Sequence, residues 1–298
     1  MLAARPLAIF ALCGFLFVSV SFSQAAAVPA ADSPAFTEVP ALAEGYQHLY
    51  EQKFPEARAE FSSWAAEHPA EPFGQDSLAA SFLYEELYRQ GVLTSDFFLN
   101  EKKFLKGIDG KPDPDRMQSF EDSLEKARDL AHKRLEKNPQ DADALFALTL
   151  ADGMESDANS ILLKKHLDAL KQMKEANEYA KELLAERPDA LDAYVALGSA
   201  NYIIGCLSGT TRFFLWFGGV HGDKQLGMAQ LQKTADGGRY LKPFAKILLA
   251  LAARREKKLP LAQKLLRELS EEFPSSPLFA AEYAKAMGWP ISAELRAP

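Results

Sequence analysis

Apolar residues along this chain recur every three to four positions, which is the spacing of one face of an α-helix. The run from Ile161 to Arg187 has apolar positions of this kind at Leu163, Leu167, Leu170, Met173, Ala176 and Ala180. Alternation of apolar and polar residues, which is typical of half-buried β-strands, does not occur along the sequence. The pattern therefore predicts an all-α fold.

A second pattern occurs at four places: a small residue, a small or apolar residue four positions later, and a proline twelve positions after the first. The four sets are Ala57, Phe61 and Pro69; Ala127, Ala131 and Pro139; Ala176, Ala180 and Pro188; and Ala262, Leu266 and Pro274. Residues four apart share a helix face, so each alanine offers a close-contact point to a neighbouring helix. The proline ends the helix, because it lacks an amide N–H and disfavours helical backbone before it. The pattern predicts repeated helices that pack through a small face.

This pattern resembles the tetratricopeptide repeat, a family of paired helices. The residues that match the first helix of its repeat are Tyr194, Leu197 and Gly198, and those that match the second are Ala176, Ala180 and Pro188. The twelve-residue gap between close-packing positions recurs from Gly45 to Ala57 and from Ala250 to Ala262. The resemblance implies a tetratricopeptide-like helical-hairpin solenoid with inserted helices over residues 41–298.

Three segments interrupt the repeats. One is Thr94–Asp115, in which we expect Asp115 to cap the following helix. Another is the stretch 151–160, expected as a break before one long helix from Ile161 to Arg187. The third follows Gly205, and the segment "DKQLGMAQLQKTA" after it is expected to be the displaced partner of the preceding helix.

The N-terminus has the features of a secretory signal peptide over residues 1–25. A single positive charge at Arg5 precedes an apolar run, and small residues follow at "SQAAA". Cys13 lies within the apolar run, without the small residue that precedes a lipid-modified cysteine, so we expect a mature protein without lipid. Residues 26–40, rich in alanine and proline, are expected to form a disordered leader. These features predict an exported, periplasmic protein that keeps one cysteine, Cys206, and no internal disulfide.

Charge and motifs argue against several functional classes. The formal net charge is −7, which disfavours nucleic acid as a partner. The histidines are scattered and form no HExxH motif, no G-x-S-x-G motif occurs, and Asp109–Asp115 lacks the ligand spacing of a calcium loop. The glycines before Lys224 do not match a phosphate-binding loop. We therefore expect no enzyme activity, no cofactor and no metal site.

An aromatic segment, Phe213, Phe214, Trp216 and Phe217, differs from the rest of the chain. Arg212 and several polar residues argue against a membrane-spanning helix there. Three interpretations stay open: a buried plug against the helices, which we favour, an exposed patch for a protein partner, or a segment that dips into a membrane surface.

The sequence thus predicts an exported scaffold that binds another protein or peptide. By the resemblance, side chains on the first helices of the repeats would contact the partner, and these are Phe146, Leu150, Val195, Ser199 and Tyr202. Helix packing is an alternative role for Phe146 and Leu150, because both are apolar. The alternative function is a membrane-peripheral component of envelope assembly that uses the aromatic segment 213–217.

Overall fold

The structure is a computed structural model that describes residues 35–37, 39–207, 209 and 221–290, all within one compact unit, Ser33–Pro298. The described part contains helices and no strand, which confirms the all-α prediction. The α-helices are α1 (Pro40–Tyr50), α2 (Phe54–Glu67), α3 (Pro72–Arg89), α4 (Ser95–Leu99), α5 (Glu101–Lys106), α6 (Pro114–Leu135), α7 (Ala142–Asp157), α8 (His166–Glu186), α9 (Tyr194–Cys206), α11 (Lys224–Gly237), α12 (Lys242–Arg255), α13 (Leu259–Glu272) and α14 (Pro277–Met287). A π-helical turn, Ala158–Leu162, follows α7, and a 3₁₀ turn, Leu191–Ala193, precedes α9. Among these helices, none is both long and apolar enough to cross a membrane.

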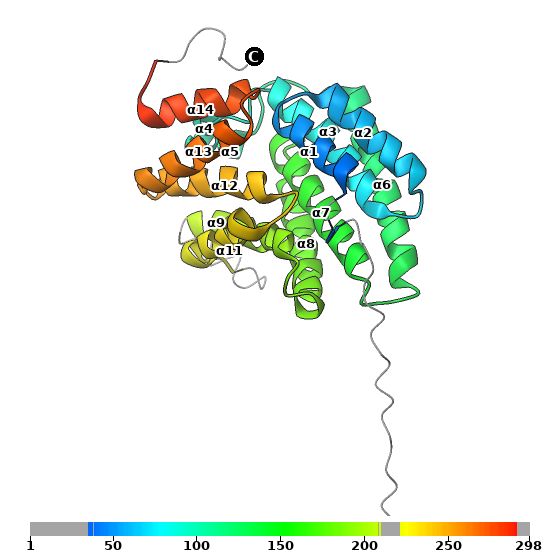
Figure 1. Ribbon diagram of the computed structural model, residues 1–298. Helices are drawn as coiled ribbons and strands as arrows, with labels where there is room; N and C mark the ends of the chain where they lie inside the picture. The colour runs from blue at the N-terminus through cyan, green and yellow to red at the C-terminus, as the bar shows by residue number, and fades with distance from the viewer. Residues whose placement is uncertain (1–34, 38, 208, 210–220, 291–298) are drawn as a thin grey trace, which may run out of the picture. The chain divides into compact units, whose positions relative to one another are not determined.

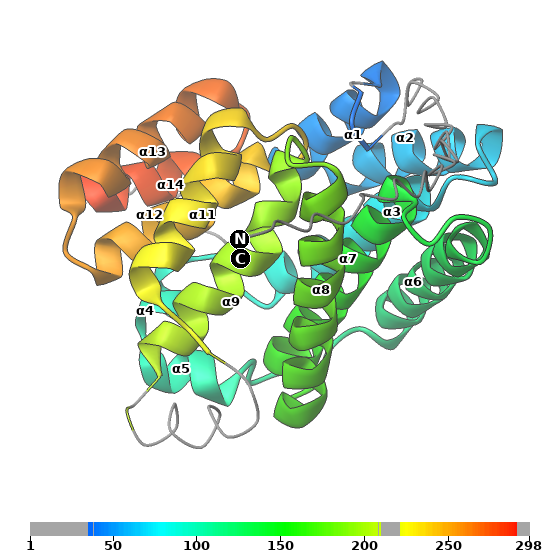
Figure 2. The same cartoon turned by 90° about the horizontal axis from the view of Figure 1, so that it is seen from below.

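The long helices lie side by side in consecutive pairs: α1 with α2, α3 with α6, α7 with α8, α9 with α11, and α12 with α13 (Figure 1). Each pair also packs against the next one, and α14 packs against α13. Figure 2 shows two of the pairs, α7 with α8 and α9 with α11, from below. Helix α11 is the displaced partner that the sequence predicts for α9. Helices α4 and α5 lie in the insertion between the two members of the second pair.

The small residues of the repeated pattern lie where helices cross. The first members, Ala57, Ala127, Ala176 and Ala262, are at most 2% exposed, and the second members, Phe61, Ala131, Ala180 and Leu266, at most 6%. A Cβ atom on Gly45 of α1 would overlap the ring of Phe61 in α2, so a larger residue at this position would force that buried ring to shift. Small residues therefore set the distance between paired helices.

Two expectations about local structure are wrong. The long helix Ile161–Arg187 is interrupted, because the π-helical turn ends at Leu162, Lys164 has a positive φ of 58°, and α8 begins at His166. Leu167, expected on the apolar face, is 84% exposed. Conversely, most of the expected break at 151–160 lies inside α7.

The cap of α6 also differs from the expectation. Asp113, and not Asp115, accepts the backbone N–H of Arg116 at 2.9 Å, while Asp115 lies in the first turn. Proline at position 114 explains the shift, because it is well suited to the first helical position and leaves the preceding residue as the cap.

The end of the expected leader contacts the helices. Ala35 is 4% exposed, and the ring of Phe36 lies 5.8 Å from that of Phe146 in α7. The backbone N–H of Val39 donates to the hydroxyl of Tyr240 at 3.0 Å. The signal peptide, the leader up to residue 34 and the aromatic segment Phe213–Phe217 lie outside the described residues.

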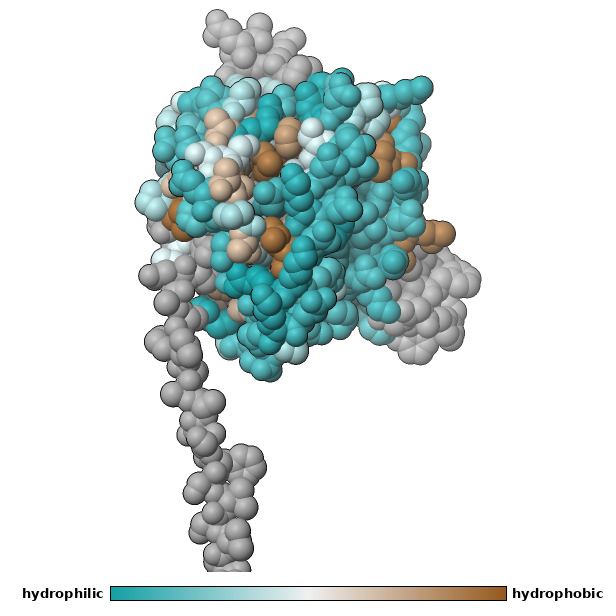
Figure 3. All heavy atoms as spheres, turned by 90° about the vertical axis from the view of Figure 1, so that its right-hand side faces the viewer, coloured by the Kyte–Doolittle hydropathy of each residue, from teal (hydrophilic) through white to brown (hydrophobic). Residues whose placement is uncertain are grey.

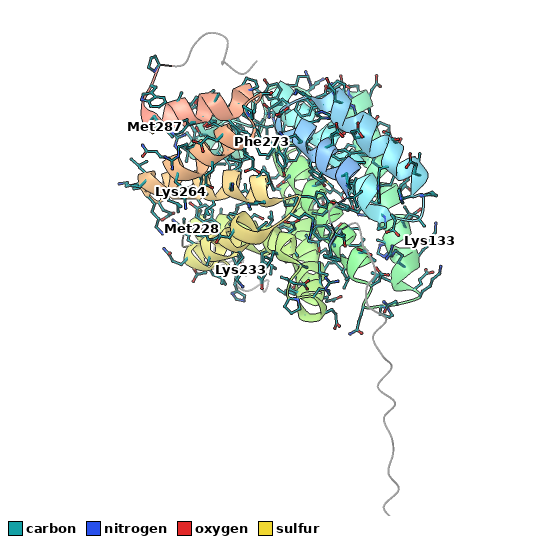
Figure 4. The ribbon with its side chains drawn as sticks, viewed as in Figure 1. Lys133, Met228, Lys233, Lys264, Phe273 and Met287 are labelled. Atoms are coloured by element: carbon teal, nitrogen blue, oxygen red, sulfur yellow. The ribbon has the colours of Figure 1, made fainter. Side chains whose placement is uncertain are left out.

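The first helical pair also contacts the last. The hydroxyl of Tyr50 in α1 donates to the carbonyl of Tyr240 before α12 at 2.9 Å, and its ring lies 5.4 Å from that of Phe273 after α13. Figure 4 labels Phe273 at this junction. The hydroxyl of Ser276 donates to Gln52 at 2.7 Å. The inner side of the helical array is therefore enclosed by its own ends.

Hydrophilic residues cover most of the molecular face shown in Figure 3. Within the described residues, the large hydrophobic side chains that are exposed come from different helices and from the chain after α14, namely Leu167, Ile203, Leu226, Leu259, Met287 and Trp289. Single residues of this kind are normal on protein surfaces.

Candidate functional site

The five predicted partner-binding residues do not form one surface. Phe146 is 1% exposed and Val195 is 7% exposed. Leu150, Ser199 and Tyr202 are half-buried. The Ser199 hydroxyl donates to the carbonyl of Val195 at 2.8 Å, a bond within its own helix, and the Tyr202 hydroxyl lies 3.3 Å from both the Ala252 carbonyl and Glu256. Phe146 and Val195 are thus core residues of the described chain.

Phe146 is buried because aromatic residues from distant helices fill the inner side of the array around it. Its ring lies 5.6 Å from that of Phe73, which in turn lies 5.1 Å from Tyr240. Tyr46 of α1 stacks on Tyr240 at 5.0 Å. Burial of several large rings stabilises this centre strongly. The packing interpretation that the sequence left open for Phe146 therefore agrees with its surroundings.

An apolar pocket remains beside this aromatic centre. Its cavity volume is about 70 Å³, and its walls come from α1, α2, α3, α4 and the loop before α4, α12, α13 and α14. Helix α12 contributes an apolar stripe, Phe244, Ile247, Leu248 and Leu251, and each of these residues is half-buried. A cavity of about 150 Å³ accommodates benzene, so the pocket suits a group of side-chain size and is too small for a nucleotide or a sugar.

The insertion between α3 and α6 forms one wall of the pocket. Leu93 and Phe98 line it, and the hydroxyl of Ser95 accepts a hydrogen bond from Arg254 of α12 at 2.5 Å. Asp96 accepts one from Lys285 of α14 at 3.0 Å. Hydrogen bonds therefore connect the insertion between α3 and α6 to α12 and α14, near the end of the chain.

Charges at the rim of the pocket are paired. Arg254 lies 3.6 Å from Glu282, and Lys285 lies 2.9 Å from the same carboxylate. Burial lowers the pKa of Lys285, but its hydrogen bonds to Glu282 and Asp96 outweigh this effect and raise that pKa above its usual value. The charges at the rim therefore neutralise one another, and the rest of the lining is mainly apolar.

None of the five predicted residues lines this pocket. One sequence signal pointed to it: the segment "KPFAKILLALAARR" of α12 is apolar on more than one side, as expected for a helix that is covered on both faces. The contribution of Phe98 carried no such signal, because its contact with α12 depends on the course of the whole chain.

In comparisons with known proteins, no family model matches the chain, and no curated protein is significantly similar to it. Among the described residues, no group of three or more histidine, cysteine, aspartate or glutamate side chains is arranged to hold a metal ion. Apolar side chains make up most of the pocket's lining.

Proposed function

We propose that the protein is an exported, tetratricopeptide-like helical-hairpin scaffold that binds a segment of another polypeptide without catalysis. The consecutive helix pairs and the alanines and glycines at their crossings support the family assignment. Repeat arrays of this architecture serve mainly as binding surfaces, since the inner helices present a concave side to a partner.

The apolar pocket between α3, α4 and α12 is the observation that supports binding. Apolar walls that remain accessible in an otherwise close-packed core are unfavourable unless a ligand covers them. A cavity of about 70 Å³ matches one apolar side chain, which would act as the anchor of a longer segment. In this proposal Leu248 and Phe98 contact the anchor, and the paired charges at the rim contact the polar backbone around it.

A crosslinking pull-down with a matched pair of variants tests the proposal. In Leu248→Trp, the larger indole fills the pocket, while Leu167→Trp places the same ring on an exposed position of α8. We expect the wild type and Leu167→Trp to recover the same polypeptide from the exported fraction of the cell, and Leu248→Trp to lose it. Both variants must first show the wild-type circular dichroism spectrum. Equal recovery by the two folded variants would refute the pocket as the anchor site.

The alternative, a membrane-peripheral component, rests on Phe213–Phe217, which lie outside the described residues. No contact of the described chain favours it over polypeptide binding. Export is part of our proposal and is tested by the mass of the mature chain: a start between Ala26 and Pro29 supports it, and an acylated Cys13 contradicts it.

A further inference from the structure

A second pocket lies where α12 ends, α13 begins and α14 ends. We call it the end pocket; its volume is about 380 Å³, and its lining includes Arg254, Leu259, Lys285 and Met287. Figure 4 labels Met287 at this end of α14. Arg254 also lines the apolar pocket, so the two pockets adjoin at its side chain. The volume of the end pocket lies within the range of ligand-binding pockets, about 300–1,000 Å³.

Exposed apolar side chains gather at the end pocket. Leu259 at the start of α13 is 53% exposed, and Met287 at the end of α14 is 36% exposed. Trp289, two residues after Met287, is 52% exposed, and its ring lies 5.5 Å from that of Tyr283. These are three of the six large hydrophobic side chains that are exposed among the described residues. Their concentration at one pocket, unlike single exposed residues, is typical of an interaction surface.

The lining of the end pocket contains two cationic side chains and no acidic one. The Nη1 atom of Arg254 donates to Ser95 at 2.5 Å and lies 3.6 Å from Glu282, whereas its Nε and Nη2 atoms bond to none of the described residues. Lys285 donates to Glu282 at 2.9 Å and to Asp96 at 3.0 Å, and an ammonium group has three hydrogens to donate. Both cations therefore keep N–H donors for a further acceptor.

The turn before α13 adds positive charge beside the end pocket. Lys257 and Lys258, which directly precede Leu259, are exposed and form no ion pair with the described residues. Glu256, the acidic residue of this turn, pairs with Lys224 of α11 at 2.8 Å. The two cations of the lining are balanced by the carboxylates that they contact, so the two lysines of the turn are in excess. A local excess of positive charge favours an anionic ligand at this place.

We propose that the end pocket binds an acidic side chain of a partner polypeptide, while an apolar residue beside that side chain packs on Leu259 and Met287. The carboxylate accepts hydrogen bonds from Arg254 and Lys285, which are stronger than bonds between neutral groups. Because Arg254 also borders the apolar pocket, one segment reaches both pockets and carries an acidic residue near its apolar anchor. This inference rests on the proposed function and specifies the chemistry of the partner.

A membrane that contains anionic lipids is the rival occupant, because lysines and exposed apolar residues also suit a bilayer surface. The side chains of Arg254 and Lys285 are only 20% and 21% exposed. A flat bilayer reaches Lys257 and Lys258 at the surface, whereas the side chain of a polypeptide extends to the cations of the lining. The net charge of −7 also opposes an anionic bilayer. A polypeptide is therefore the favoured occupant.

Isothermal titration calorimetry with the full mature chain provides the test. The probes are the peptide acetyl-Leu-Glu-Glu-Leu-amide, its neutral counterpart acetyl-Leu-Gln-Gln-Leu-amide, and acetyl-Ser-Glu-Glu-Ser-amide, which keeps the charge and lacks the apolar residues. We expect the first peptide to bind about tenfold more tightly than the second, as for hydrogen bonds to a charged group. It should also bind more tightly than the third, and its advantage over the second should shrink at about 0.5 M salt.

Two pairs of variants locate the binding site. Lys285→Gln removes a cation of the lining, and Lys264→Gln removes one from an exposed position of α13 outside the pocket. Leu259→Ser removes an apolar wall, and Leu226→Ser changes a similarly exposed leucine of α11. We expect Lys285→Gln to bind the Glu peptide about fivefold more weakly and the Gln peptide as the wild type does. Leu259→Ser should weaken both peptides, and the two controls should match the wild type.

Equal affinities for the Glu and Gln peptides, or an unchanged preference in folded Lys285→Gln, would overturn the inference. If the protein shows no such preference but sediments with phosphatidylglycerol vesicles, a membrane occupies this surface instead. The two proposals fail separately, because Leu248→Trp fills the apolar pocket and leaves the end pocket open. A preference for the Glu peptide that persists in Leu248→Trp supports the end pocket even where the pull-down refutes the anchor site. A pull-down that confirms the anchor, without this preference, refutes the end pocket alone.

Discussion

Replacement of Gly227 by alanine tests the close approach of α9 and α11. A Cβ atom at this position would lie 2.6 Å from the backbone nitrogen of Tyr202 and 2.7 Å from the carbonyl oxygen of Gly198, both in α9. No rotation of a side chain relieves a contact with backbone, so α9 must move by about 0.8 Å to restore an ordinary contact of 3.4 Å. Overpacking of this kind costs about 1–3 kcal/mol.

Gly153→Ala is the matched control, because Gly153 also lies inside a helix and a Cβ atom there meets nothing within 4 Å. Alanine is favoured over glycine in a helix by about 1 kcal/mol, and both variants gain this term. We therefore expect Gly153→Ala to be more stable than the wild type, and Gly227→Ala to be less stable than Gly153→Ala by about 1–3 kcal/mol. In a chain of this size the two melting temperatures should differ by several degrees, at about 2–4 °C per kcal/mol.

Urea denaturation followed by circular dichroism measures both variants under identical conditions. Equal midpoints for Gly227→Ala and Gly153→Ala would refute the close crossing of α9 and α11. A lower m-value for Gly227→Ala alone would show instead that the pair separates before the rest of the chain unfolds.

Two further predictions concern stability. Ala176 is 2% exposed at the crossing of its helix, so Ala176→Leu should lower the free energy of unfolding by about 1–3 kcal/mol, while the surface control Lys181→Ala should change it by less than about 0.5 kcal/mol; similar thermal melts of the two would contradict the repeat register. The pKa of Asp157 is raised to about 7 by desolvation, so the folded state binds a proton that the unfolded state has released, and stability falls as the pH rises from about 4 to 7. Asp157→Asn lacks this loss, and its melting temperature relative to the wild type should therefore rise over this pH range, whereas a constant difference would show that Asp157 is well solvated.

Local spacing explains why much of the helical architecture is predictable. The burial of Ala57 and Ala262 follows from positions four residues apart and from a proline that ends the helix, and all of this information lies within about fifteen residues of sequence. The sequence also predicts the partner of α9, and in the structure Asp223 caps this partner, α11, by accepting hydrogen bonds from the N–H groups of Gln225 and Leu226. Such signals are independent of the rest of the chain.

Long-range contacts explain why the candidate site was not predictable. Phe146 lies on a first helix, where the family pattern implies an accessible side chain, but Phe36 and Phe73 cover it. Whether an inner helix face is open depends on how far the array curves, and this is decided by contacts such as that of Tyr50 with Phe273. No spacing within one helix contains that information.

Two carboxyl groups of the described chain, those of Asp76 and Asp157, have raised pKa values but differ in their access to solvent. Both oxygens of Asp76 are buried without a hydrogen-bond partner, and burial raises its pKa well above the usual value, which favours the protonated form in the core. Asp157 shares the raised pKa but is reached by solvent, and it ionises near neutral pH. Asp76 is closed to solvent and to any partner from outside, whereas Asp157 can exchange its proton with solvent. The accessibility of Asp157 to solvent, more than its raised pKa, therefore distinguishes this carboxyl group from that of Asp76.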